Sequence, residues 1–521
     1  MDNENYYLRI SKATDLKNPK DRALYRFLEM LPGICSWGSL LIAVLLSWRY
    51  PALIAIFIIG FSIMWTVRAF YFAFHLWSGY KNMRVNENRN WLGELEKLPK
   101  EKYSLNIDNW QEIYHLAIIT IYKEPLEIIR DTINSLKNCD YPKNRMIVVL
   151  ACEEKTRTKN EEIVSVINEE FEDIFFRLVI SWHPSDLPNE IAGKGSNETW
   201  AVKEVKKELI DRLGLPYDQV TVSPFDADTV IYPKYFSCLT WHYLTCRKPT
   251  RTSFQPIPLF NNNIWSAPAI SRIFSFSSTF WQVMNQERPE KMITFSSHSM
   301  SLQALVEVGF KDPRVVADDS HIFWQCFLRF NGDYQVIPMF YPVSMDANVA
   351  ENFFKTMVNI YKQQKRWAYG VGDVAYLIFG FIKNKKIGLK SKLSHAFEAI
   401  EGHWSWAVAP LLIFIFGWLP IVVGGEAFSQ TMLSYSLPKM VSRISTMAMI
   451  GLVVSAYLSI LLLPSRPPEY GRLKIVFFVF GWLLVPIIMI IFSSFPALDA
   501  QTHWLTGRYM GFWSTDKLRT K

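Results

Sequence analysis

The sequence predicts a doubly wound α/β domain inserted between two groups of membrane helices. Hydrophobic residues make up 50% of the 521-residue chain. They gather at both ends, where several segments approach the roughly 20 residues that a helix needs to cross a bilayer. The middle instead alternates short apolar runs with helix-like segments, which is typical of a parallel sheet covered by helices.

Two apolar segments near the N-terminus predict a helical hairpin. They run from about Leu31 to Trp48 and from Pro51 to about Trp77. We therefore expect a cytosolic segment over residues 1–30 and two transmembrane helices over residues 31–84. Only one basic residue lies in the turn, whereas lysines and arginines flank the hairpin on both sides. The positive-inside rule then places both flanks, and the domain that follows, at the cytoplasmic face of the inner or plasma membrane.

Residues 85–373 form the predicted soluble domain. Short β-branched runs that suit buried parallel strands alternate there with helical segments. Ligands of such sheets bind at the carboxyl ends of the strands, so polar motifs directly after strands carry the most information about function. The expected strands are Leu116–Ile121, Met146–Leu150 and Val220–Val222, and the expected helices are Pro125–Leu136 and Thr199–Leu213.

The C-terminal part predicts interfacial helices over residues 374–402, a transmembrane region over residues 403–495 and a cytosolic tail over residues 496–521. Three apolar segments make up the transmembrane region, and three crossings would carry the basic tail to the outside. Prolines interrupt the first and the last of these segments, and broken helices are tolerated where protein covers the freed backbone. We therefore expect one segment to be re-entrant or interfacial and the C-terminus to be cytoplasmic.

The net charge of +8 does not predict a nucleic-acid partner. Basic residues lie mostly beside apolar segments rather than in a stripe with interleaved aromatic residues, which favours contact with membrane lipid. The six cysteines form no C-x-x-C pair or zinc spacing, so we expect reduced thiols without a metal role.

An acidic motif, Phe225-Asp226-Ala227-Asp228, follows the Val220 strand. Its two carboxylates could share a divalent ion together with the diphosphate that the ion bridges. Mg²⁺ suits this arrangement because it binds oxygen ligands and usually takes one or two carboxylates plus substrate phosphates. A solvated turn is the alternative interpretation of an isolated D-x-D.

The connection after the first strand contains Thr120, Tyr122 and Glu124. A polar mouth between a strand and a helix suits a nucleoside, with Tyr122 available for stacking and Glu124 for hydrogen bonding. An ordinary strand–helix connection is the alternative.

A second acidic pair, Asp318 and Asp319, precedes a helical run at Ser320. A sugar transfer with inversion needs a base that takes the proton of the acceptor hydroxyl, and an aspartate within hydrogen-bond reach would serve. Either aspartate could instead cap the helix, and both roles are compatible because capping orients the neighbouring carboxylate.

A polar and aromatic motif, Gln363-Gln364-Lys365-Arg366-Trp367, lies on a predicted helix. Helical spacing brings Gln363, Arg366 and Trp367 to one face. Arginine can bind phosphate through two hydrogen bonds, and the indole offers a flat surface for a sugar ring. Tryptophan and arginine are also ordinary membrane-interface residues, which is the alternative.

With these motifs in this order, the chain resembles the family 2 glycosyltransferases. It is most similar to the membrane-bound processive synthases of the cellulose, chitin, hyaluronan and curdlan kind. The resemblance covers about Leu116 to Gly370 together with the membrane helices. It implies a Rossmann-like GT-A domain, an inverting hexosyl transfer from a nucleotide sugar and Mg²⁺ or Mn²⁺ as the cofactor.

The resemblance also implies roles for individual residues. Asp226 would bind the nucleotide diphosphate, Asp228 the metal, and Asp319 would be the base, with Asp318 beside it. The segment Gly193-Lys194-Gly195-Ser196-Asn197 matches one that contacts the nucleotide, through Lys194 and Asn197. The acceptor and diphosphate site would be lined by Gln363, Arg366 and Trp367.

Some positions depart from the family pattern. The T-E-D motif of the family reads Ala317-Asp318-Asp319 here, and the usual aspartates after the second strand are replaced by Glu153 and Glu154, either of which would stand in. A UDP-sugar is favoured and a GDP-sugar stays open. Near the C-terminus, Phe512-Trp513-Ser514-Thr515-Asp516-Lys517 is similar to the F-x-V-T-x-K gating loop, through Phe512, Thr515 and Lys517; a polar tail is the alternative.

The favoured hypothesis is a synthase that extends a polysaccharide and passes it through its own helices. The alternative enzyme adds one sugar, UDP- or GDP-linked, to a lipid or lipid-linked acceptor. A transporter or receptor without catalysis is disfavoured, because transporters place ionisable residues inside their spans and here the spans are nearly free of acids.

Overall fold

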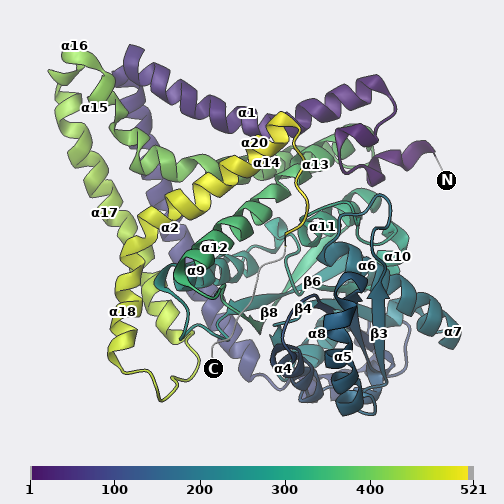
Figure 1. Ribbon diagram of the computed structural model, residues 1–521. Helices are drawn as coiled ribbons and strands as arrows, with labels where there is room; N and C mark the ends of the chain where they lie inside the picture. The colour runs from purple at the N-terminus through teal and green to yellow at the C-terminus, as the bar shows by residue number, and fades with distance from the viewer. Residues whose placement is uncertain (1–2, 514–521) are drawn as a thin grey trace.

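One eight-stranded sheet forms the centre of the α/β domain in the computed structural model, which describes residues 3–513 (Figure 1). The strand order is β3-β2-β1-β4-β7-β6-β8-β5. The first four strands pair in parallel, as the sequence predicts, whereas β7 runs antiparallel to both of its neighbours. The strands are β1 Tyr114–Ile121, β2 Met146–Glu153, β3 Arg177–His183, β4 Val220–Asp226, β5 Val230–Ile231, β6 Thr252–Phe260, β7 Ser299–Ser301 and β8 Gln335–Met345.

The parallel register brings the carboxyl ends of three strands to one edge. Thr120 of β1 pairs with Asp226, the last residue of β4, and Ile121 pairs with Cys152 of β2. Glu153 then ends β2 beside them. The candidate site residues Thr120, Glu153 and Asp226 therefore lie at one edge of the sheet, because three parallel strands end there.

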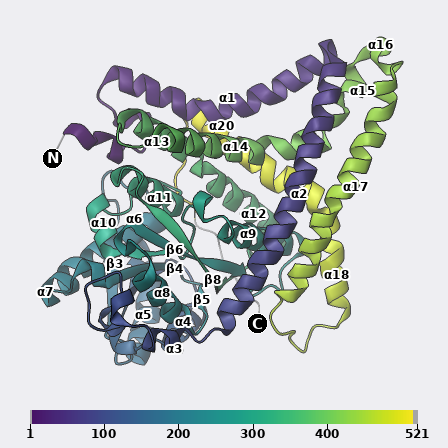
Figure 2. The same ribbon diagram turned by 180° about the vertical axis from the view of Figure 1, so that it is seen from behind.

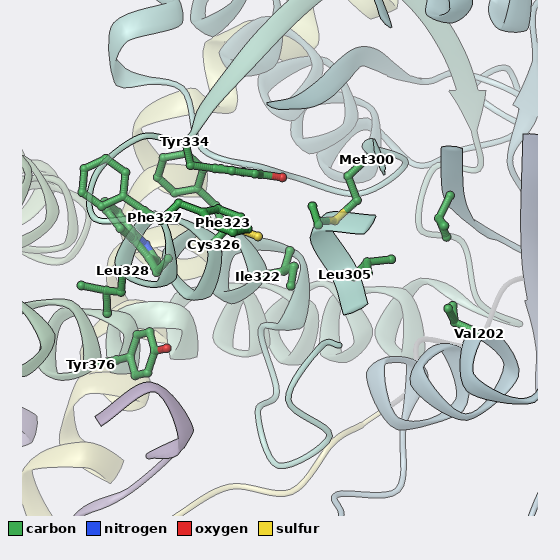
Figure 3. Packing of buried hydrophobic residues seen from close by; sticks show 14 of the residues in the cluster. Val202, Met300, Leu305, Ile322, Phe323, Cys326, Phe327, Leu328, Tyr334 and Tyr376 are labelled. Carbon is green, nitrogen blue, oxygen red and sulfur yellow. The ribbon is translucent and has the colours of Figure 1, made fainter. Parts of the chain in front are cut away.

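Helices cover both faces of the sheet. Successive residues of β1 enter opposite hydrophobic cores, with Leu116 and Ile118 in one and Ala117 and Ile119 in the other. Figure 3 shows the first core, where the aromatic side chains of α11 gather near Tyr334. The helices that contribute to that core include α6 Lys194–Val205, α10 Leu302–Val308 and α11 Asp318–Arg329. The helices that contribute to the other core are α3 Trp91–Glu96, α4 Leu126–Lys137, α5 Arg157–Phe171 and α8 Tyr235–Thr245.

Long apolar helices lie along one side of the α/β domain (Figures 1 and 2). Within residues 3–513, four helices are long and apolar enough to cross a membrane, and a bent pair makes a fifth. Asn18 caps the first of them by accepting hydrogen bonds from two backbone N–H groups of its first turn. The four long helices are α1 Pro19–Arg49, α2 Pro51–Asn88, α17 Met432–Leu461 and the continuous segment Leu473–Thr506. The bent pair consists of α14 Leu389–Phe414 and residues 416–423, which include α15 Leu419–Val423, and its two parts meet at 46°.

The segment Leu473–Thr506 begins and ends against the α/β domain. Just before it, the backbone carbonyl of Pro464 accepts a hydrogen bond from the indole of Trp265 (3.2 Å). Near its end, the indole of Trp504 donates to the backbone carbonyl of Tyr369 (3.1 Å). The segment comprises α18 Leu473–Gly481, α19 Val485–Met489 and α20 Phe495–Thr506, joined by a 3₁₀ turn at Trp482–Leu484 and a π-helical turn at Ile490–Ser494.

A core helix occupies part of the region expected to be interfacial. In α13 Gly372–Lys383, Val374, Leu377 and Phe379 are fully buried, because the helix packs against α1 and α11. The start of α14 instead exposes Leu389, Leu393 and Phe397. The remaining helices are α7 Asp211–Leu213, α9 Ala269–Gln286, α12 Phe353–Ala368 and α16 Gly425–Ser429.

Candidate active site

Lys194 joins the two predicted acidic motifs. Its Nζ lies 2.9 Å from Oδ1 of Asp226 and 3.4 Å from Oδ2 of Asp319. Lys194 opens α6, Asp226 ends β4 and Asp319 lies in the first turn of α11. The residue expected to contact the nucleotide thus lies between the carboxylate expected to bind diphosphate and the carboxylate expected to be the base.

A second lysine, Lys311, organises three carboxylates. Its Nζ lies 2.6 Å from Glu198, 2.9 Å from Asp318 and 3.0 Å from Oδ1 of Asp319. The three carboxylates could together hold a cation, with oxygen atoms within 4.8 Å of one another, and the ammonium of Lys311 is bonded to all three. Neither aspartate acts as the helix cap, since Ala317 occupies that position.

The charges of this cluster keep Asp319 ionised. Burial by itself would raise the pKa of Asp319, but the nearby ammonium groups of Lys194 and Lys311 outweigh it and hold that pKa well below the usual range. Burial likewise raises the pKa of Glu198 despite the same two lysines. Asp319 is therefore held in the charged form that a base requires.

Asp228 lies deeper than Asp226. It is fully buried, and its Oδ2 accepts a hydrogen bond from the backbone N–H of Asp346 (2.9 Å), directly after β8. The amide of Asn262 donates to the backbone carbonyl of Asp228 (3.0 Å). Asp226 is a quarter exposed and also accepts from the hydroxyl of Ser296 (3.2 Å). An all-oxygen donor set at a strand end suits Mg²⁺ or Mn²⁺.

The connection after β1 is ordered by its own glutamate. The carboxylate of Glu124 accepts hydrogen bonds from the backbone N–H groups of Tyr122 (2.7 Å) and Lys123 (3.0 Å). The Thr120 hydroxyl points at the backbone carbonyl of Phe225 (3.5 Å). Glu124 thus shapes the turn that carries Tyr122, a role that the sequence did not distinguish from direct contact with a nucleoside.

Glu153 belongs to a buried acid–histidine–acid arrangement. Nδ1 of His183 lies 3.1 Å from Glu153, and Nε2 of the same ring lies 3.0 Å from Glu190. Burial would lower the pKa of His183, but Glu153 and Glu190 outweigh it and raise that pKa above its ordinary value. Asn197, one helical turn into α6, donates its amide to the backbone carbonyl of Ala151 (2.8 Å) and so anchors the end of β2.

The three residues expected to share one face of α12 make different contacts. Gln363 accepts a hydrogen bond from the amide of Asn348 (3.1 Å). Trp367 packs against Phe260 and Phe295, with ring centroids 6.4 and 5.9 Å away. Burial lowers the pKa of Arg366, and Asp226, Asp318 and Asp319 counteract that shift from the acidic cluster. The helix therefore presents its cation toward the acids and its indole toward an aromatic wall.

The C-terminal chain returns to this site. The ring of Phe512 lies so close to Gly193 that a Cβ there would come within 2.4 Å of it. The guanidinium carbon of Arg366 lies 4.8 Å from the centre of the same ring. Gly193 is thus required by the approach of a residue from the far end of the chain. Thr515 and Lys517, the other two expected gating residues, lie outside the described residues.

Several residues of this site were not found from the sequence. Lys311, Glu198 and His298 have no motif of their own and reach the cluster only because α6, α11 and the segment before β7 converge. His298 is fully buried, and burial lowers its pKa to about 4, so it faces Asp319 as a neutral ring (4.0 Å). The sequence contains one weak indication of His183: it ends strand β3, and its partner at the end of the neighbouring strand β2 is Glu153.

Fold and site together define a nucleotide-sugar transferase. The sequence profile of the glycosyl transferase family group 2 matches residues 222–495, more than half of the chain. The protein belongs to this family and is a family 2 glycosyltransferase with a GT-A-like domain. None of the curated proteins compared with it matches the sequence.

Solved glycosyltransferases resemble the chain only distantly. The mannosyltransferase PcManGT from Pyrobaculum calidifontis, in complex with GDP-Man and Mn²⁺, has 16% identity and a TM-score of 0.40, over 77% of this chain and 99% of its own. Residues 1–349 of TarS from S. aureus have 10% identity and a TM-score of 0.36, over 76% and 93%. GalNAc-T7 with UDP, GalNAc and Mn²⁺ has 10% identity and a TM-score of 0.32, over 58% of each chain.

Proposed function

We propose that the protein is an inverting hexosyltransferase that moves a sugar from a nucleotide sugar, with UDP favoured over GDP, to an acceptor at the cytoplasmic face of a membrane. The observation that carries this proposal is the position of Lys194 between Asp226 and Asp319. The ammonium of Lys194 links Asp226, which is proposed to face the diphosphate, with Asp319, which is proposed to take the proton. Such a pairing is expected where a leaving group and a base act on opposite sides of one sugar carbon.

In the proposed reaction, the acceptor hydroxyl attacks the anomeric carbon and its proton passes to Asp319. The bond from that carbon to the phosphate oxygen breaks, and the nucleoside diphosphate leaves with the electron pair. An incoming diphosphate offers Lys194 a second anionic partner. Any weakening of the Lys194–Asp319 contact raises the pKa of Asp319 toward its ordinary value, which makes it a stronger base.

Asp228 would hold the divalent metal, and Asp226 would lie on the side of the nucleotide diphosphate. Their all-oxygen character and their place at the end of β4 fit such an ion, which would neutralise charge that develops on the leaving diphosphate. Arg366 adds a fixed guanidinium that can bind phosphate through two hydrogen bonds. Trp367 and Gln363, which lie on α12 within one helical turn of Arg366, would hold the acceptor.

The membrane arrangement proposed here has four crossings and one re-entrant segment. α1, α2, the bent α14–α15 unit and α17 would cross, and Leu473–Thr506 would enter and return. The contacts of Trp265 with Pro464 and of Trp504 with Tyr369, one at each end of this segment, support the proposal. Both chain ends and the α/β domain would then lie on the cytoplasmic side, and the contact of Phe512 with Gly193 supports placing the C-terminal chain on the same side as the α/β domain.

The acceptor is proposed to be a growing polysaccharide, with a single lipid-linked sugar acceptor as the alternative. Purified protein incubated with a panel of UDP- and GDP-sugars, with nucleotide release measured, tests the transferase. Long products identify chain growth, and products with one added sugar identify the alternative. Retention of the anomeric configuration, followed by NMR, would contradict the inverting mechanism, and absence of nucleotide release with every donor would contradict the proposal as a whole.

A further inference from the structure

A buried arginine on α9 has no carboxylate partner among the described residues. Arg272 is only 9% exposed, and its one hydrogen bond goes to the backbone carbonyl of Ala267. Burial lowers its pKa to about 10, so the guanidinium keeps its charge at neutral pH. A buried charge is costly unless an opposite charge or hydrogen-bonding groups offset the lost water.

Aromatic rings and a second cation surround this arginine. The guanidinium carbon of Arg272 lies 3.9 Å from the ring centre of Phe478, which packs against Trp265 at 5.2 Å. Nζ of Lys474, one turn earlier on α18, lies 3.4 Å from the ring centre of Tyr470, and that ring stacks on Trp265 at 6.0 Å. Two cations thus share one aromatic cluster, and the cation–π contacts offset part of the burial of Arg272.

The cluster lies between a lipid-facing surface and the acceptor side of the active site. On α18, Leu473 and Phe477 are 73% and 69% exposed, as expected of residues that face hydrocarbon. On the other side, the Ser271 hydroxyl donates to the backbone carbonyl of Asn348 (2.5 Å), whose amide donates to Gln363. Because Ser271 is the neighbour of Arg272, a ligand at Arg272 would lie next to the hydrogen-bonded chain from Ser271 through Asn348 to Gln363, at the proposed acceptor site.

We propose that Arg272 and Lys474 form a binding site for the phosphate group of a membrane amphiphile. The two cations bind the phosphate, and the exposed apolar face of α18 lies beside the hydrocarbon chain. The inference rests on the proposed function for its position beside the acceptor site. It deepens that function by assigning a phosphate-bearing lipid to this position. Arginine suits the role because its planar donors match phosphate geometry.

The test uses the full chain in phosphatidylcholine nanodiscs and follows bound lipid by native mass spectrometry. Three probes are compared: a long-chain isoprenyl monophosphate, phosphatidylglycerol and inorganic phosphate. Arg272→Met is expected to weaken lipid phosphate binding about 10- to 100-fold, the usual effect of losing hydrogen bonds to a charged group. Arg288→Met, just past the end of the same helix and over the ring of Tyr71, is the matched control and keeps full binding.

Each outcome decides the proposal. If the wild type prefers isoprenyl monophosphate, the ligand is a lipid-linked acceptor. If it binds phosphatidylglycerol equally well, the ligand is a membrane lipid. Either result supports the site when Arg272→Met loses that lipid binding. Equal lipid binding by Arg272→Met and the wild type overturns it, as does binding of inorganic phosphate alone. Lys474→Met, on α18 rather than α9, is expected to weaken lipid phosphate binding independently if the site exists. Nucleotide release to water, measured in parallel, reports on the proposed transferase without the lipid.

Discussion

The ammonium of Lys194 lies 3.4 Å from the carboxylate of Asp319, and the two residues are brought together by α6 and α11, which pack into the same core on one face of the sheet. This contact holds the pKa of the candidate base well below its ordinary range. Asp319 therefore stays charged at every pH at which the protein is expected to work. The first two predictions follow from that relationship.

Asp319→Asn is expected to bind nucleotide sugar nearly normally and to lose about 10²–10⁴ in transfer rate, since the amide keeps the shape but cannot accept a proton. Nucleotide binding by calorimetry and turnover by nucleotide release measure the two quantities separately. Asp318→Asn is the matched comparison, because it removes the neighbouring carboxylate only. Near-wild-type turnover in Asp319→Asn would transfer the role to Asp318 or remove it from both.

Lys194→Met is expected to move the acid limb of the kcat/KM pH profile to higher pH. In the wild type the acid limb lies at low pH because Lys194 favours the ionised form of Asp319. Removing the lysine raises the pKa of Asp319, so the base becomes protonated at less acidic pH. Lys203→Met on the same helix, where the ammonium lies over the ring of Phe310, is the control. An unchanged acid limb would show that Lys194 does not set the ionisation of the base.

Activity is expected to require Mg²⁺ or Mn²⁺ and to fall sharply in Asp228→Asn. The asparagine keeps an oxygen for the Asp346 backbone N–H but loses the charge that a metal needs. Turnover against metal concentration, after treatment with a chelator, measures the effect. Asp333→Asn, on an exposed aspartate paired with Lys248, is the control. Full turnover in excess chelator would rule the metal out.

Trp367→Ala is expected to raise the KM for the acceptor about 2- to 10-fold and to leave nucleotide affinity nearly unchanged. The indole forms an aromatic wall with Phe260 and Phe295, and such contacts contribute about 0.5–1.5 kcal/mol beyond area burial. Trp281→Ala, an exposed tryptophan on α9, controls for loss of an indole in general. Loss of nucleotide affinity with normal elongation would contradict the acceptor assignment.

A cysteine placed after Lys521 is expected to resist an impermeant thiol reagent in intact cells and to react after permeabilisation. The reason is that Phe512 contacts Gly193 and Arg366 at the active site, so the tail and the α/β domain share one side of the membrane. Five of the six native cysteines are buried and Cys35 is partly so, which makes the unmodified chain a suitable background control. Labelling in intact cells would contradict both the topology and the gating interpretation.

The sequence by itself determined the order of the chemical motifs and the local structures that carry them. The runs before Asp226 and around Leu116 are strands because β-branched residues suit a buried parallel sheet, and Gln363, Arg366 and Trp367 share a helix face because of helical spacing. These features depend on residues close together in the chain, and periodicity reports on them directly.

Only the tertiary structure decided which distant residues meet. Lys311 bonds Glu198 and Asp318 because α6 and α11 converge, and no local pattern in the sequence predicts that contact. The tail reaches the active site because Leu473–Thr506 returns to the α/β domain, where Phe512 packs on Gly193. Such contacts depend on long-range packing, which fixes the positions of whole elements after their local structure is set.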